Sequence, residues 1–298
     1  MSWLTDPLHF AFVRHALIVC TFAGGLCGLL GVFVTLRGMS YIGHGLSHAI
    51  FGGAAICAAV GLNFFAGAGI WGLGTGLAIS RVTQRRIIGS DAAIGVITTA
   101  SFAFGIALLG FSTKVKRSIE ATVFGSVLGV ATSDVWIIIA VTAVTVLVVA
   151  LRYRAFLFTT FDPEVANVSG VNTARIDAIL MLLLSVAILA SMRVLGVTLI
   201  AAALVIPPVV ARMLTDSFAR MLWLSTSIGA VDGFVGMFLS YHLDISSGAT
   251  IVLVGFLLFV VVFAMTGGKG VRRTVGMDQH GAPAVSPIGV IEPVGGLA

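Results

Sequence analysis

The sequence predicts an all-α, polytopic integral membrane bundle of about eight or nine transmembrane helices. Of its 298 residues, 58% are hydrophobic and only 10% are charged, whereas soluble domains carry about 25% charged residues. The mean hydropathy is +1.12, and long apolar segments alternate with short charged loops, as expected of a chain that crosses a membrane repeatedly. These features exclude a soluble globular protein. In a membrane protein the net charge of +5 indicates basic loops and not a nucleic-acid partner.

Nine apolar segments follow one another, each bounded by charges, glycines or a polar loop. They cover residues 16–36, 41–60, 64–80, 92–111, 135–151, 178–192, 197–211, 221–243 and 247–265. The seventh contains Pro207 and Pro208, which predict a kink or an end because proline donates no backbone hydrogen bond. Residues 1–273 are predicted to form one transmembrane domain. Residues 274–298, rich in Gly and Pro, are predicted to form a disordered cytoplasmic tail.

The loop charges predict the orientation. Most of the seventeen Lys and Arg residues lie in loops on one side, among them those containing Arg37, Arg81, Arg152 and Arg212. The positive-inside rule places these loops in the cytoplasm and the N-terminus outside. The chain is therefore predicted to be a multi-pass membrane protein, with Arg37 at one membrane edge.

Two histidines, His44 and His48, lie in the second segment, within a run from Gly38 to Ser80 that has no Lys, Arg, Asp or Glu. At a spacing of four they share one face of a helix. From Arg37, a rise of about 1.5 Å per residue places them roughly 10 and 16 Å deep, near the middle of the bilayer. Neutral imidazole is a good ligand for Mn, Fe, Cu or Zn ions. The pair is a candidate metal contact; the alternative is that each histidine bonds a neighbouring helix and fixes packing.

The loop at residues 160–171 predicts a short helix. Asp162 is a good N-cap, Pro163 suits the first helical position, Glu164 complements the positive helix end and Gly170 is a natural terminator. One interpretation is simply a capped amphipathic loop helix. In the other, the apolar anchors Phe161 and Val165 enter a cleft on a soluble partner.

Three stretches together resemble the permease subunits of the metal-type ABC importers, which take up manganese, zinc or iron. They are 36–49 (LRGMSYIGHGLSHA), 161–170 (FDPEVANVSG) and 195–212. The resemblance covers residues 10–265. It implies a homodimeric permease of the cell inner (plasma) membrane that works with a cytoplasmic ATP-binding subunit and an extracellular or periplasmic metal-binding protein. It further implies that Phe161, Asp162, Pro163, Glu164, Val165, Ala166 and Gly170 form the coupling helix that docks on the ATPase.

The family motif in the second segment usually reads Gly-Asp-x-Leu-Ser-His, and its carboxylate and histidine are the candidate metal ligands. Here His48 matches, while His44 occupies the carboxylate position. The change removes a negative charge and softens the site, which slightly favours Zn or Fe over Mn. No permanently bound cofactor is expected, since the metal is cargo.

Asp232 is another ionisable group well inside an apolar segment. It is a weaker candidate for a metal or proton site on the transport path; the alternative is a hydrogen-bonded carboxylate in the bundle. Gly267-Gly268-Lys269-Gly270 lacks the spacing of a phosphate-binding loop, so ATP hydrolysis is expected on a separate subunit and the chain is not expected to be an enzyme. Two other hypotheses stay open. One is a stand-alone secondary transporter driven by an ion gradient, and the other is an intramembrane enzyme or cofactor protein that uses the histidine pair.

Overall fold

The computed structural model describes residues 9–84, 89–110, 130–197 and 199–277, in which every predicted apolar segment is helical. The helices are α2 (Ala11–Leu36), α3 (Ile42–Ala59), α4 (Phe64–Gln84), α5 (Ser90–Gly110), α7 (Thr132–Leu151), α8 (Tyr153–Phe161), α9 (Pro163–Val168), α10 (Thr173–Leu195), α11 (Ile200–Leu214), α12 (Phe218–Leu243) and α13 (Ser247–Met277). The predicted all-α membrane bundle is confirmed.

Within the described ranges, six helices are long and apolar enough to cross a membrane: α2, α5, α7, α10, α12 and α13. The apolar helices α3 and α11 are shorter. α4, predicted as a span, has 21 residues and carries Arg81 in its last turn, and it is not among the six. The count of full-length spans is thus smaller than the number of predicted segments.

Several elements differ from the sequence prediction, among them α2, which starts at Ala11 and not at residue 16. α10 starts at Thr173 and not near residue 178, because the Asn172 side chain caps it by accepting a hydrogen bond from the Arg175 N–H (3.0 Å). α8 was not predicted; it forms because its apolar face, with Phe156 fully buried, packs on the core. α13 continues to Met277 and so includes the first residues of the predicted tail, whose remainder, 278–298, lies outside the described residues.

α11 continues through Pro207 and Pro208 to Leu214, so of the two predicted outcomes at the prolines, a kink or an end, the end is wrong. Pro208 has no N–H for the carbonyl of Leu204, four residues earlier. That carbonyl lies against Gly31 of α2, so closely that a Cβ at Gly31 would collide with it. Gly31 thus lets α11 pack closely on α2 at the point where the prolines interrupt its hydrogen-bond ladder.

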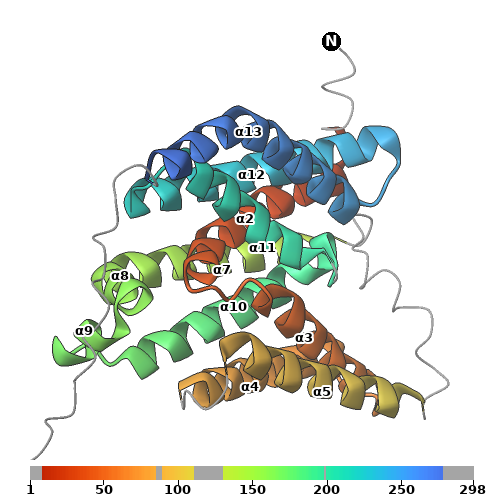
Figure 1. Cartoon of the computed structure of the whole chain (residues 1–298). Helices are drawn as coiled ribbons and strands as arrows, with labels where there is room; N and C mark the ends of the chain where they lie inside the picture. The colour runs from red at the N-terminus through yellow and green to blue at the C-terminus, as the bar shows by residue number, and fades with distance from the viewer. Residues whose placement is uncertain (1–8, 85–88, 111–129, 198, 278–298) are drawn as a thin grey trace, which may run out of the picture.

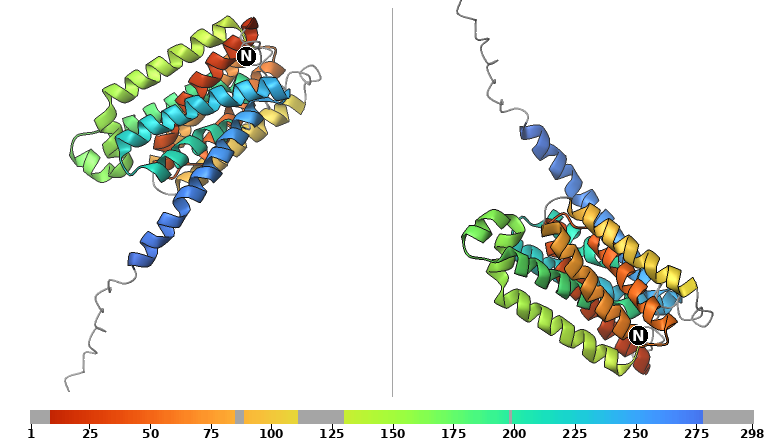
Figure 2. Two further views of the ribbon diagram at one scale, coloured as in Figure 1. Left: turned by 90° about the horizontal axis from the view of Figure 1, so that it is seen from above. Right: turned by 90° about the horizontal axis from the view of Figure 1, so that it is seen from below.

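α2 is the centre of the bundle (Figure 1). It packs on α11 and α12 on one side and on α7 and α10 on the other, and α13 lies against α11 and α12. α3, α4 and α5 form a second group, joined to the first mainly through α10 and α11. The end of α13 extends beyond the bundle (Figure 2).

The α2–α12 contact depends on glycines spaced four residues apart, a pattern that lets membrane helices approach closely. Gly24 and Gly28 of α2 lie against the backbone of α12 near Gly229, and Gly233 lies against the α2 carbonyl of Cys20. A Cβ at any of these glycines would overlap backbone atoms of the other helix. The small residues thus determine how near the two helices come.

Candidate functional site

The two predicted histidines come together on α3. Their rings meet edge to face, with centroids 4.4 Å apart and planes at 72°. Both side chains are half-buried, and both line a cavity of about 210 Å³. The cavity walls come from α3 and α5, namely Tyr41, His44, Gly45, His48, Thr98, Thr99 and Phe102. The i, i+4 spacing therefore directs both imidazoles at one small open space.

Close packing of α3 on α5 shapes this cavity. A Cβ at Gly45 would lie 2.7 Å from the Thr98 hydroxyl and 3.1 Å from Ile94, so glycine is required for the contact. The Thr98 hydroxyl donates to the Ile94 carbonyl (2.7 Å), and the Ser47 hydroxyl donates to the carbonyl of His44 (2.9 Å). These hydroxyls are satisfied by backbone, which leaves the imidazoles as the strongest metal-ligating groups of the cavity.

His48 has a distinctive environment. Its ring lies edge to face with that of Phe102 of α5, with centroids 4.8 Å apart and planes at 72°. In the described structure its Nδ1 is buried without a hydrogen-bond partner. Histidines that bind metal usually donate their second ring nitrogen to a neighbouring acceptor. The ring of His44 lies beside that of Tyr41, with ring centroids 5.5 Å apart.

Sequence reasoning missed the remaining cavity residues. Tyr41 was detectable, because it lies three residues before His44 and so shares its helix face. Thr98 and Phe102 carried no such signal, since only the tertiary structure places α5 opposite α3. Among the residues that the structure describes, no three His, Cys, Asp or Glu side chains form a metal-binding group. One chain thus contributes two imidazoles at this cavity.

Asp232 is not part of this site. It lies on α12, is 6% exposed, and its Oδ1 is buried without a hydrogen-bond partner among the described residues. A Cβ at Gly255 of α13 would lie 2.8 Å from its Oδ2 and 3.3 Å from Ile206 of α11. The structure therefore places Asp232 between α11, α12 and α13, apart from the histidine cavity.

The predicted loop helix is present, and its capping is confirmed. The Asp162 side chain accepts a hydrogen bond from the Val165 N–H (2.9 Å), and Pro163 occupies the first turn of α9. Gly170 has a φ of +81°, a left-handed conformation that favours glycine, and the Val171 N–H closes the turn on the carbonyl of Ala166 (2.9 Å). We call residues 161–170 the coupling segment, after the role that the family resemblance implies for them.

The coupling segment has one buried and several exposed apolar side chains. Ala166 is fully buried, whereas Phe161 and Val165 are 58% and 50% exposed. The Phe161 ring also packs edge-on against Phe218 of its own chain, at 5.7 Å between centroids. Val168, which the sequence analysis did not single out, is the most exposed of these apolar side chains at 91%. The apolar surface of the segment therefore combines the two predicted anchors with Val168.

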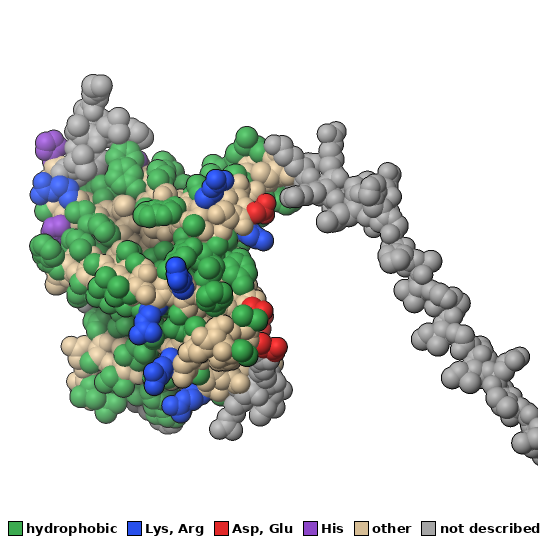
Figure 3. Space-filling model, turned by 90° about the vertical axis from the view of Figure 1, so that its left-hand side faces the viewer, with side chains coloured by type: hydrophobic (Ala, Val, Ile, Leu, Met, Phe, Trp, Pro, Cys, Tyr) green, Lys and Arg blue, Asp and Glu red, His purple; other side chains and the backbone are tan. Residues whose placement is uncertain are grey.

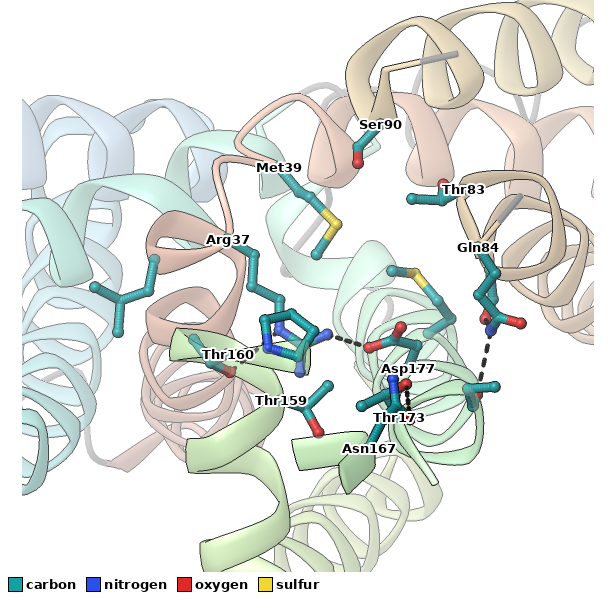
Figure 4. A pocket seen from close by; sticks show the side chains of 15 residues that line it. Arg37, Met39, Thr83, Gln84, Ser90, Thr159, Thr160, Asn167, Thr173 and Asp177 are labelled. Carbon is teal, nitrogen blue, oxygen red and sulfur yellow. Dashed lines mark hydrogen bonds and ion pairs between the residues drawn. The ribbon is translucent and has the colours of Figure 1, made fainter. Parts of the chain in front are cut away.

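Arg37 is buried beside the coupling segment (Figure 4). Its Nη1 donates to Oδ1 of Asp177 on α10 (2.5 Å), and its Nε donates to the Thr160 hydroxyl at the end of α8 (3.2 Å). The side chains of Arg37 and Asp177 are 10% and 28% exposed. Burial lowers the pKa of Arg37, while the charge of Asp177 opposes this shift. The guanidinium remains charged at neutral pH, as arginine does in proteins.

A cavity of about 620 Å³ opens beside this ion pair. Its walls come from the connection between α2 and α3, from the ends of α4 and α8, and from the starts of α5, α9 and α10. Figure 3 shows the side of the molecule that lies on the left in Figure 1. On this face Lys and Arg side chains are spread among hydrophobic ones, with acidic groups toward one edge and histidines toward the other.

Comparison with known proteins agrees with this architecture. The chain is 36% identical over 270 residues to the "Manganese transport system membrane protein MntC" of Listeria monocytogenes, covering 91% of this chain and 96% of that protein. It is 31% identical to a "Probable iron transport system membrane protein" of Haemophilus influenzae, covering 88% and 97% of the two chains. Among solved structures, it is similar to PsaBC from Streptococcus pneumoniae in complex with Fab, with a TM-score of 0.77, 32% identity and coverage of 88% and 94%.

The family described as the ABC 3 transport family matches residues 9–266, which include both the histidine cavity and the coupling segment. The apolar helices and the membrane-protein relatives together establish a multi-pass protein of the plasma membrane. The resemblance found in the sequence is confirmed: the chain is a permease-type protein that belongs to the ABC 3 transport family.

Proposed function

We propose that this chain is the membrane-spanning subunit of an ATP-driven importer that carries a divalent transition metal, Mn, Zn or Fe, into the cytoplasm. His44 and His48 contact the ion on its path. The observation that carries the proposal is the pair of imidazoles, 4.4 Å apart between ring centroids, facing one cavity within a membrane bundle. An ionisable pair in such a place is costly and by default functional.

The chemistry of the cavity bears on the choice of ion. Relatives are named for manganese or iron transport. No carboxylate belongs to the described cavity lining, and nitrogen ligands suit Zn and Fe better than Mn. Two imidazoles do not complete a coordination shell. We infer that a second copy of the chain, water or another helix supplies the other ligands.

The coupling segment supports the assignment of ATP binding to a separate subunit. Its exposed apolar side chains Phe161, Val165 and Val168 fit a groove on a cytoplasmic ATP-binding subunit, as apolar anchors on a helix do. ATP hydrolysis then belongs to that subunit. An external metal-binding protein delivers the ion at the opposite side, and two copies of the permease form the pathway.

The test is metal uptake by liposomes that contain the purified chain, with and without its ATP-binding subunit and metal-binding protein, using Zn, Mn and Fe in parallel. We expect uptake only with the full assembly and ATP, and a loss of about tenfold or more in His48→Ala, because one of two protein ligands is removed. His9→Ala, at an exposed histidine, is the control. Gradient-driven uptake by the chain alone would indicate a secondary transporter instead.

A further inference from the structure

Arg37 contacts the chain on both sides of the coupling segment. Thr160 directly precedes the segment and Asp177 follows it on α10, and Arg37 donates a hydrogen bond to each. The Thr173 hydroxyl also donates to Oδ1 of Asn167 (3.0 Å), which joins the start of α10 to α9. Hydrogen bonds therefore join three elements into one unit: the end of α8, α9 and the start of α10. Arg37 binds this unit through Thr160 and Asp177.

On its other side, Arg37 is tied to the helix that bears the histidines. It is the C-cap of α2, and its N–H donates to the carbonyl of Phe33 (3.1 Å). The Met39 N–H donates to Val34 O (3.0 Å), and the Ile42 N–H, which opens α3, donates to Met39 O (2.9 Å). The connection between Arg37 and α3 is thus a hydrogen-bonded turn that joins the backbone of Arg37 directly to the start of α3.

The chemistry of the contact favours a specific mechanical link over general packing. The Arg37 side chain is only 10% exposed and that of Asp177 is 28% exposed, so removing Asp177 would leave a largely desolvated guanidinium without its partner charge. The planar guanidinium also donates in two directions at once, here to Asp177 and Thr160, which a lysine ammonium does not reproduce with the same geometry. One side chain thereby joins residues that are distant in sequence, and it lines the cavity of about 620 Å³.

We propose that Arg37 is a positioning residue that transmits movement of the coupling segment to the start of α3, and so to His44 and His48. The proposal rests on the proposed function, because it assigns a route from the ATP-binding subunit to the metal contact. It predicts that loss of Arg37 separates ATP hydrolysis from transport, whereas loss of a merely structural contact would lower both together.

The experiment measures ATP hydrolysis and metal uptake in the same liposomes, containing the full assembly with wild-type chain, Arg37→Ala, Arg37→Lys or Asp177→Asn. We expect Arg37→Ala and Asp177→Asn to keep ATP hydrolysis within about twofold while the uptake per ATP falls about tenfold, the scale of ordinary coupling between sites. The uptake per ATP of Arg37→Lys should lie between that of these two variants and that of wild type. The control is Arg81→Ala, at an exposed arginine outside the cavity lining.

The charge-exchange variant Arg37→Asp/Asp177→Arg covers the case in which single variants misassemble. Partial recovery of uptake per ATP relative to Asp177→Asn supports the link. Unchanged uptake per ATP in Arg37→Ala and Asp177→Asn overturns it, as does a parallel loss of hydrolysis and uptake without recovery in the exchange variant. If wild type itself shows no ATP-dependent uptake, the proposed function fails, and this outcome differs from the others.

Discussion

The hydroxyl of Ser225 on α12 donates a hydrogen bond to the carbonyl of Gly28 on α2, over 2.6 Å. The bond is buried and joins the two helices where glycines bring their backbones together. A carbonyl within a helix already accepts one bond from its own ladder, so Ser225 uses the second lone pair. The central contact of the bundle thus combines close approach with a directional interaction.

Gly28→Ala should therefore destabilise the bundle. The added Cβ would overlap backbone atoms of Ser225 and lie 3.2 Å from Cα of Thr226, and backbone has little freedom to move. Overpacking of this kind costs about 1–3 kcal/mol. Thermal unfolding of the purified chain in detergent should show a lower midpoint. Gly74→Ala is the matched control, because nothing lies within 4 Å of a Cβ there. Its thermal unfolding midpoint should equal or exceed that of wild type.

His44→Asp should change the selectivity of uptake. The variant restores the carboxylate that the family motif carries at this position, and oxygen ligands suit Mn better than imidazole does. We expect the ratio of Mn to Zn uptake to rise by about tenfold, the lower end of the effects of changes around metal ligands. Competition between the two ions in the reconstituted assembly measures this ratio. An unchanged ratio would mean that His44 does not contact the ion.

Val168→Glu should weaken binding of the ATP-binding subunit. Val168 is 91% exposed on the coupling segment, so a charge there does not disturb the fold of the chain but opposes an apolar groove. Changing one of the few residues that dominate an interface costs more than about 1 kcal/mol, and we expect binding to fall by about tenfold in a pull-down of the purified subunits. Val60→Glu, 70% exposed in the turn that follows α3, should bind normally. Equal binding of the two variants would count against docking through Val168.

Asp232→Asn should leave metal uptake within about twofold. The carboxyl is buried between α11, α12 and α13 and apart from the histidine cavity, and the amide keeps its volume while removing a buried ionisable group. Thermal stability should stay equal or rise. The comparison with Asp232→Leu, which removes all polar atoms, shows whether hydrogen bonding matters at this place. A severe loss of uptake in a stable Asp232→Asn variant would instead assign the carboxylate to the transport path.

The residues that define the membrane class and the local motifs were readable from sequence because their signals are short in range. A run of apolar residues predicts a helix wherever it packs, and the spacing of His44 and His48 places them on one face of any α-helix. Asp162, Pro163 and Gly170 likewise determine a capped turn within ten residues. Each of these features was found where it was expected.

Local signals failed where a distant partner decided the outcome. The prolines predicted either a kink or an end, and α11 continues to Leu214 with Pro208 packed beside Gly31 of α2. α8, which was not predicted, forms where Phe156 packs on Phe33, with ring centroids 5.1 Å apart. The apolar composition of these segments does not identify such partners.

The sequence by itself determined that this protein is a helical membrane protein, where its apolar segments lie, and that two histidines share a helix face. Only the tertiary structure decided that α5 closes the histidine cavity, that Asp232 lies apart from it, and that Arg37 meets Asp177 across 140 positions of chain. The physical reason is the distance along the chain over which each signal acts. Periodicity and capping act within a few turns of one helix, whereas helix-to-helix contacts depend on which small, polar and apolar surfaces fit together in three dimensions.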